Sequence, residues 1–293
     1  MKQTILLLFI ISLSTKCCSQ QFGRVNNFWQ VYARSNPAQT NSFDSLEVNL
    51  IGRAQDIGFP GAPSTLFANY NQICTKIHGS FGFSSEYDEI GFNNSLNFKM
   101  NYTYRLATRI GDWAFGTNLG INFLGVGGDW IPPQTLQDAS LPKFNQETFQ
   151  IDLGVAYKLN NLRLGLGMVN YSLVLDNNPI VFNYAPHFTF NSAYHLKFSD
   201  KWSSDVFFQF LTDTKYYTPD LGILFSYTKS LNFGVIVHNF DGFESIYYGL
   251  TAGYNHKSGI GIYSSFVIGG VYYKNYLNRP SIEIGLRFRR KSL

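Results

Sequence analysis

Charged side chains are scarce in this chain of 293 residues. Asp, Glu, Lys and Arg together make up 14% of it, against about 25% in ordinary soluble domains. The formal net charge is only +4, and basic residues cluster only at positions 287–291. This scarcity excludes the broad basic surface that nucleic-acid binding requires. We expect no nucleic-acid partner, and we expect the C-terminal basic cluster to face water at a membrane boundary.

Long hydrophobic runs are missing as well. A transmembrane helix needs about 20 consecutive apolar residues, and the apolar stretch at residues 5–13 is too short. If the chain crosses a membrane, it must therefore do so as a closed β-barrel. The reason is that only helices and closed barrels satisfy every backbone hydrogen-bonding group in lipid.

The beginning of the chain has the three parts of a secretory signal peptide. Lys2 precedes the short apolar run, and small residues follow that run up to Ser19, the order typical of exported proteins. We predict a signal peptide over residues 1–19 that is removed after export. The alternative is a lipoprotein, in which Cys17 or Cys18 carries the lipid.

Cysteine is rare, and it carries little chemistry here. The chain has three cysteines, and removal of the signal peptide leaves Cys74 alone, without an intramolecular disulfide partner. No Cys/His spacing matches a zinc site, and the acidic loops lack the spacing of a calcium site. We therefore expect no metal ion and no cofactor.

Alternating side chains are what this chain has in abundance. Over residues 96–106, large apolar residues occupy the even positions and Asn, Lys, Thr or Arg the odd ones. Successive side chains of a strand point to opposite faces, so this segment has one apolar and one polar face, and it is long enough to cross a bilayer. The pattern recurs, including a third strand expected over residues 75–84. We predict an all-β fold, a transmembrane antiparallel β-barrel of about 14 strands over residues 44–289, with 12 or 16 strands as alternatives.

Residues 20–43 lack this alternation. Phe28, Trp29 and Tyr32 have nearly helical spacing, and Pro37 disfavours helix at the residue before it. We predict a short N-terminal plug or lead-in segment that lies in the barrel lumen or across its periplasmic mouth. Glycines at inward positions of the strands would let backbone approach closely; these are Gly116, Gly120, Gly154, Gly165 and Gly167.

Catalytic patterns are missing from the sequence. His187 and His195 fall on one face of a predicted strand, but eight residues apart they are too distant to act as a pair. His238 lies near Asp241, as at an ordinary strand end, and no serine-elbow motif is present. We expect no catalytic residues and no enzymatic activity.

Motifs at both ends of the chain carry a family resemblance. An aromatic stretch at residues 28–32 is followed by Asn36-Pro37-Ala38, and residues 281–288 form a characteristic last strand. A second N-terminal motif contains Arg53, Gln55, Gly58, Gly61, Ala62, Pro63 and Thr65. In this combination and order the chain resembles the PorP/SprF family.

The resemblance implies an outer-membrane protein of Bacteroidota tied to type IX secretion and gliding motility. It implies a non-enzymatic barrel that binds, helps to secrete or anchors a large surface protein carrying a C-terminal sorting domain. The expected partners are the lipid bilayer, that secreted protein and, for members of the core machinery, periplasmic components of the secretion machine. The candidate plug or partner contacts are Phe28, Trp29, Tyr32, Asn36 and Pro37. A transport barrel for hydrophobic or small solutes is the alternative, because strand number and plug would suit it equally.

Overall fold

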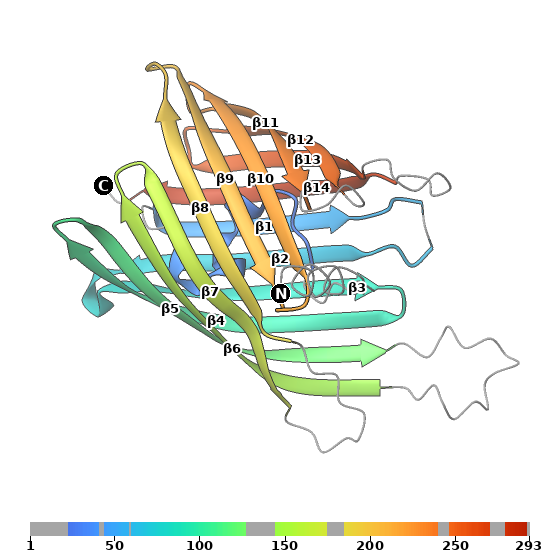
Figure 1. Ribbon diagram of the computed structural model, residues 1–293. Helices are drawn as coiled ribbons and strands as arrows, with labels where there is room; N and C mark the ends of the chain where they lie inside the picture. Colours follow the sequence, from blue (N-terminus) through green and yellow to red (C-terminus); the bar gives the residue numbers. More distant parts are fainter. Residues whose placement is uncertain are drawn as a thin grey trace, which may run out of the picture.

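The computed structural model describes residues 23–40, 44–58, 60–126, 144–174, 185–239, 246–269 and 279–291. The predicted signal peptide and residues 20–22 and 41–43 of the predicted lead-in lie outside these ranges. Within them, 14 antiparallel strands form one sheet that closes into a barrel (Figure 1). This confirms the predicted fold and strand number.

The ring closes between its first and last strands, β1 (Asp44–Ala54) and β14 (Ser281–Lys291). Every other strand pairs with its neighbours in the sequence, so no strand edge is left open to lipid. The intervening strands are β2 (Ser64–Cys74), β3 (Gly79–Ile90), β4 (Asn93–Thr108), β5 (Gly111–Val126), β6 (Phe144–Leu159), β7 (Leu162–Val174), β8 (His187–Lys197), β9 (Trp202–Thr212), β10 (Tyr217–Tyr227), β11 (Leu231–His238), β12 (Tyr247–Asn255) and β13 (Ile260–Gly269).

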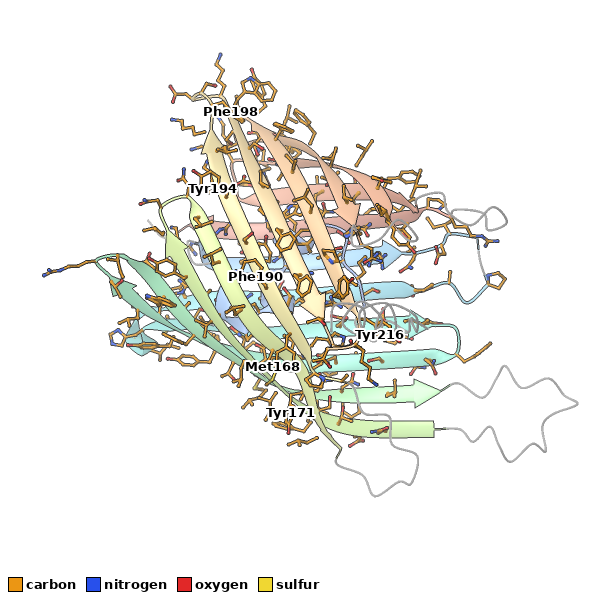
Figure 2. All side chains as sticks on the ribbon, in the orientation of Figure 1. Met168, Tyr171, Phe190, Tyr194, Phe198 and Tyr216 are labelled. Atoms are coloured by element: carbon orange, nitrogen blue, oxygen red, sulfur yellow. The ribbon has the colours of Figure 1, made fainter. Side chains whose placement is uncertain are left out.

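The two faces of the barrel wall differ as the alternation predicts. On β4, Phe98, Met100 and Tyr102 are exposed on the outer face, whereas Thr103 is fully buried on the inner face. Figure 2 shows the same arrangement on β8, where Phe190 and Tyr194 lie on the outside of the ribbon. An apolar exterior around a polar interior is the arrangement that a bilayer stabilises. Among the described residues, no helix has the length and hydrophobicity that crossing a membrane would take.

The two ends of the barrel have connections of different length. At the end where β1 begins, connections range from two residues, 160–161, to four residues, 75–78. At the opposite end connections range from two residues, 91–92, to the long connection between β5 and β6, residues 127–143. Outer-membrane barrels keep short turns in the periplasm and longer loops outside. We therefore refer to the short-turn end as the periplasmic mouth and to the other as the loop end.

The third strand was predicted wrongly at both limits. Residues 75–77 form a 3₁₀ turn, η3 (Thr75–Ile77), and β3 begins only at Gly79. Glycine is needed there because an added Cβ would lie 1.9 Å from the carbonyl oxygen of Thr103. β3 also continues to Ile90, through a polar stretch that sequence alternation alone does not mark as a strand.

A charge on the outer face should destabilise the barrel. Met100 lies near the middle of β4 and is 65% exposed on the lipid-facing side. We expect Met100→Arg to lower the free energy of unfolding by about 2–4 kcal/mol, because the guanidinium would lie near the bilayer midplane. Urea unfolding in lipid vesicles measures this, with Met100→Leu as the control. Equal stability of the two variants would show that this face does not contact lipid.

Candidate functional site in the barrel lumen

Residues 23–40 lie inside the barrel, and we call them the lumen segment. They form three short turns of helix, η1 (Phe28–Gln30), α2 (Tyr32–Ser35) and η2 (Pro37–Gln39). Figure 1 shows this segment, in dark blue, surrounded by the strands. Asn26, Asn27 and Asn36 are completely buried, so the segment is packed inside the barrel near its beginning and near its end.

Aromatic side chains form the apolar part of this packing. Trp29 stacks on Phe207 of β9, with ring centroids 4.9 Å apart and planes 6° from parallel. Phe28 and Tyr32 pack edge-on beside them. Gly222 of β10 makes room for the indole, because a Cβ there would lie 2.3 Å from a ring carbon of Trp29.

A buried carboxylate holds the beginning of the segment. Glu283 of β14, which is fully buried, accepts the backbone N–H groups of Asn26 at 2.6 Å and Asn27 at 3.0 Å. It also accepts the side-chain amide of Asn27 at 2.8 Å. Arg53 donates to the Asn26 side chain at 3.0 Å, and Thr251 donates to the Asn27 side chain at 2.7 Å. Charge-assisted hydrogen bonds of this kind are about twice as strong as neutral ones.

An ion pair holds the middle of the segment. The guanidinium of Arg34 donates through two nitrogens to both carboxylate oxygens of Glu86 on β3, with the Nε contact at 2.6 Å. Glu86 faces the lumen, so this polar stretch of β3, which pairs with β2 and β4 along its length, also has a side-chain partner inside the barrel. A two-pronged arginine–carboxylate contact fixes orientation as well as position.

The Asn-Pro-Ala turn fits a groove lined by glycines. The Asn36 side chain caps η2 by accepting the Ala38 N–H at 2.9 Å, and it donates to the carbonyls of Val155 and Leu166. The Pro37 carbonyl accepts a hydrogen bond from Thr103 at 2.8 Å. The close approach predicted at inward glycines occurs where an added Cβ would lie within 3 Å of this segment, at Gly116, Gly154, Gly165 and Gly167. At Gly120 the close approach is made by the neighbouring strand β4 and not by the lumen segment, because a Cβ there would lie 2.6 Å from the carbonyl oxygen of Phe98 and 2.6 Å from the side chain of Lys99.

The residues of the second family motif lie in two places, on the wall around the lumen and in a turn at the loop end. Arg53 donates to Gln55 at 2.9 Å, and Thr65 donates to Asp88 at 2.6 Å, which links both ends of the motif to the wall around the lumen segment. Between them Gly58 and Gly61 adopt positive φ values of 89° and 72°, which glycine tolerates best. Ala62 and Pro63 belong to the same turn, which the Gln55 N–H closes by donating to the Pro63 carbonyl at 2.9 Å.

The structure brings together histidine–aspartate pairs that sequence reasoning missed. His238 Nδ1 lies 2.9 Å from Asp220 Oδ1 across the β10–β11 pair, and both residues are buried. His195 Nδ1 lies 2.8 Å from Asp205 Oδ1 on β9. The short β10–β11 turn could have revealed the first pair, because it sets the register of Asp220 against His238. In the described ranges no three His, Cys, Asp or Glu side chains gather as a metal site would require.

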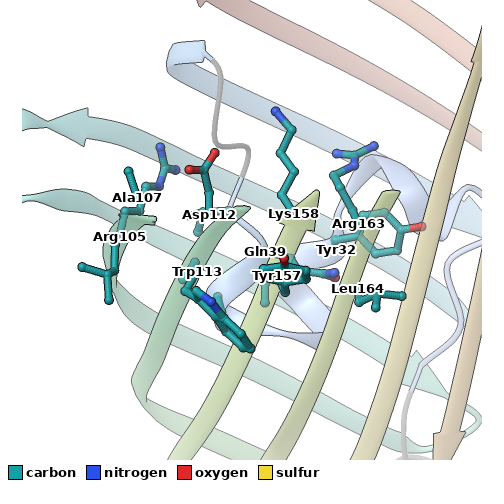
Figure 3. Close-up of a pocket in the computed structure, with 15 residues that line it drawn as sticks. Tyr32, Gln39, Arg105, Ala107, Asp112, Trp113, Tyr157, Lys158, Arg163 and Leu164 are labelled. Atoms are coloured by element: carbon teal, nitrogen blue, oxygen red, sulfur yellow. The ribbon is translucent and has the colours of Figure 1, made fainter. Parts of the chain in front are cut away.

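Cavities remain on both sides of the lumen segment. Toward the loop end, a space of about 70 Å³ is lined by polar residues such as Asn97, Asn122 and Gln150. Toward the periplasmic mouth there are two larger spaces, of about 260 Å³ and 620 Å³. Figure 3 shows the first of these, with the charged ends of Asp112, Lys158 and Arg163 pointing to the same side of the strands.

A closed strand ring with an apolar exterior and a polar, occupied lumen defines an outer-membrane β-barrel protein. The model of the type IX secretion system membrane protein family PorP/SprF matches residues 18–288, and the chain belongs to this family. The predicted family and outer-membrane location are thereby confirmed. No curated protein matches the chain.

Solved structures of similar fold are also outer-membrane barrels. The CymD monoaromatic hydrocarbon channel aligns with a TM-score of 0.60 and 11% identity, over 92% of this chain and 94% of that chain. Omp33 of Acinetobacter baumannii aligns with a TM-score of 0.53 and 12% identity, over 85% and 100% of the two chains. The Pseudomonas putida toluene transporter TodX aligns with a TM-score of 0.51 and 12% identity, over 88% of this chain and 92% of that chain. At these identities the similarity extends to the fold alone.

Removing the Glu283 carboxylate should release the beginning of the lumen segment. In Glu283→Ala, three buried N–H donors lose their acceptor, at a cost of about 1–3 kcal/mol for each unsatisfied group. We expect much faster amide hydrogen exchange at residues 26–40, with strand exchange little changed. Glu147→Ala, which removes an exposed carboxylate, is the matched control. Unchanged exchange in Glu283→Ala would show that this carboxylate does not hold the segment.

Proposed function

We propose that this protein is a non-enzymatic barrel of the type IX secretion machinery that binds a large secreted surface protein and helps to secrete or anchor it. The observation that carries this proposal is the lumen segment, held in place by buried hydrogen bonds and an ion pair. A barrel whose lumen is occupied by a packed segment is better suited to binding a protein at its ends than to passing a solute along its axis.

The energetics favour a segment that stays in place. Withdrawing it would expose the aromatic cluster around Trp29 and Phe207 and would separate Arg34 from Glu86. Breaking a buried ion pair by removing one partner typically costs about 3–5 kcal/mol. The lumen segment is therefore proposed as a permanent plug that supports the barrel wall.

An apolar patch at the loop end is the proposed contact for the secreted protein. The β1–β2 and β3–β4 turns are joined there by a hydrogen bond from the Gly91 N–H to the Gly61 carbonyl at 2.9 Å. Ile90 and Phe92, on either side of Gly91, are 44% and 42% exposed, and Ile57 in the β1–β2 turn is 42% exposed. Exposed apolar side chains gathered on one surface typically mark a protein-binding site. The family turn motif would then serve to position this patch.

Charge substitutions in the patch should reduce recovery of the secreted partner. We expect Ile57→Glu combined with Phe92→Glu to lower, by about tenfold, the amount of a large secreted protein that co-purifies with the tagged barrel. Burying a carboxylate at an apolar interface costs several kcal/mol, which is ample for this loss. The measurement is a mild-detergent pull-down from the native outer membrane, followed by mass spectrometry.

The matched control for that experiment is Ile77→Glu. Ile77 is 39% exposed but lies in the periplasmic turn η3, at the other end of the barrel. Full partner recovery with Ile77→Glu and loss with the patch variant would support the proposal. A wild-type barrel that purifies folded and alone, without any large secreted protein, would overturn it.

The second candidate function is a transport barrel for hydrophobic or small solutes. It is favoured by the similarity in fold to proteins described as a hydrocarbon channel and a toluene transporter. The two functions differ in whether the lumen conducts, and conductance can be measured directly.

The wild-type barrel should not conduct ions in planar bilayers, whereas displacing the lumen segment should open it. An added Cβ at Gly154 would lie 2.0 Å from the Asn36 side chain, so we expect Gly154→Leu to expel the Asn-Pro-Ala turn and to show stable conductance. Gly52→Leu is the control, because a Cβ at Gly52 meets no atom within 4 Å. Steady conductance or solute uptake by the wild-type protein would favour the transport function instead.

A further inference from the structure

The two ends of the lumen differ in charge balance. The cavity toward the loop end contains two cationic side chains, Arg34 and Lys99, and two carboxylates, Glu86 and Asp88. Both cations there are already in ion pairs, Arg34 with Glu86 and Lys99 with Asp152. The loop-end cavity therefore presents no net charge to a ligand.

The two cavities at the periplasmic mouth are strongly basic, and together we call them the basic vestibule. Their carboxylates are those of Asp112, Asp200 and Asp205 alone. Their cationic side chains come from β4, β6, β7, β8 and β14 and from two turns; they are Arg105, Lys158, Arg163, Lys197, Lys201, Lys229, Arg287 and Arg289. Because Arg163 lines both cavities, they share a wall and form one basic surface.

Part of this positive charge is not neutralised from within the protein. Lys197 pairs with Asp200 at 2.7 Å, and Arg289 pairs with Glu47 at 3.3 Å. In the parts of the chain that the structure describes, Arg163, Lys201 and Lys229 form no ion pair with any carboxylate. Three cations are therefore available to an anionic ligand.

Two of these cations lie side by side at the rim. Lys201 ends the β8–β9 turn and Lys229 lies in the β10–β11 turn, and the Thr228 N–H donates to the Lys201 carbonyl at 2.7 Å. Both lysines are exposed. They are therefore the first charges that a molecule approaching this part of the mouth would meet.

The shape of the vestibule favours a chain molecule over a small ion. The larger cavity, about 620 Å³, is of the size that holds an organic ligand. Its cations are spread over several strands and do not converge on one point, as they would around a single phosphate. The three cations that form no ion pair in the described residues come from separate elements, Arg163 from β7 and Lys201 and Lys229 from two turns. Trp29 and Phe207 add apolar surface at the floor.

We propose that the basic vestibule is a binding site for an extended acidic segment of a periplasmic protein. The site lies at the opposite end of the barrel from the proposed contact for the secreted protein. This proposal goes beyond the binding of a secreted protein. Peptide binding at the vestibule can be measured on the isolated barrel, whether or not a secreted protein is bound.

The test uses the full-length barrel in detergent and a fluorescently labelled decapeptide of alternating Glu and Ser, followed by fluorescence anisotropy. A decapeptide of alternating Gln and Ser is the neutral reference. We expect the acidic peptide to bind, the neutral peptide not to bind, and affinity to fall steeply as sodium chloride is raised, because screening weakens exposed charge interactions.

Two charge reversals at the rim should weaken this binding. We expect Lys201→Glu combined with Lys229→Glu to lower affinity about tenfold or more, because like charges would then face the peptide. The matched control is Lys76→Glu combined with Lys215→Glu, which changes the net charge equally at two lysines outside the vestibule. We expect the control to bind within about twofold of the wild type, since long-range charge effects alone are screened in salt.

Three outcomes would overturn the proposal. The first is equal binding of the acidic and neutral peptides, and the second is equal loss of affinity in the rim and control variants. The third is no acidic-peptide binding together with saturable binding of glycerol phosphate, which would assign the vestibule to a lipid headgroup. If the variant with two glutamates does not fold, the double variant Lys201→Gln, Lys229→Gln takes its place. We expect this neutral variant to lower the affinity for the acidic peptide severalfold.

Discussion

The pairing of β1 with β14 is the contact on which the rest of the structure depends. It closes the ring of backbone hydrogen bonds, which a barrel in lipid cannot leave open. Its register also places Arg53 directly opposite Glu283. These two side chains then hold Asn26 and Asn27 from the same position on the wall. Barrel closure and attachment of the lumen segment are therefore parts of one arrangement.

The lumen segment provides hydrogen-bond partners for the polar side chains that line the inside of the barrel. Buried polar groups are costly unless they are hydrogen-bonded, and the inner wall carries many Asn, Thr, Ser and Gln side chains. The segment supplies backbone and side-chain partners to residues on β3, β4, β6, β7, β8, β12, β13 and β14. Because these contacts are spread around the circumference, the segment ties the opposite sides of the wall together.

This arrangement gives the molecule a densely hydrogen-bonded middle and two chemically different ends. The loop end presents exposed apolar side chains on paired turns, whereas the periplasmic mouth presents lysine and arginine. Apolar and basic surfaces select different partners, because one gains from desolvation and the other from charge complementarity. The two proposed partners, a surface protein at one end and an acidic periplasmic segment at the other, would require both kinds of surface.

The sequence by itself determined the number of strands, the membrane-facing side and the family, but not the limits of β3. Strand side chains alternate with a period of two, so residues 96–106 revealed both faces of β4 without reference to any other strand. The inward glycines on β5, β6 and β7 also indicated close backbone approach, although not which backbone would approach. Only the tertiary structure decided the pairings of Arg34 with Glu86, Asp220 with His238, and Glu283 with Asn26 and Asn27. These partners are far apart in the chain, and they meet only when the strand register is set and the ring is closed.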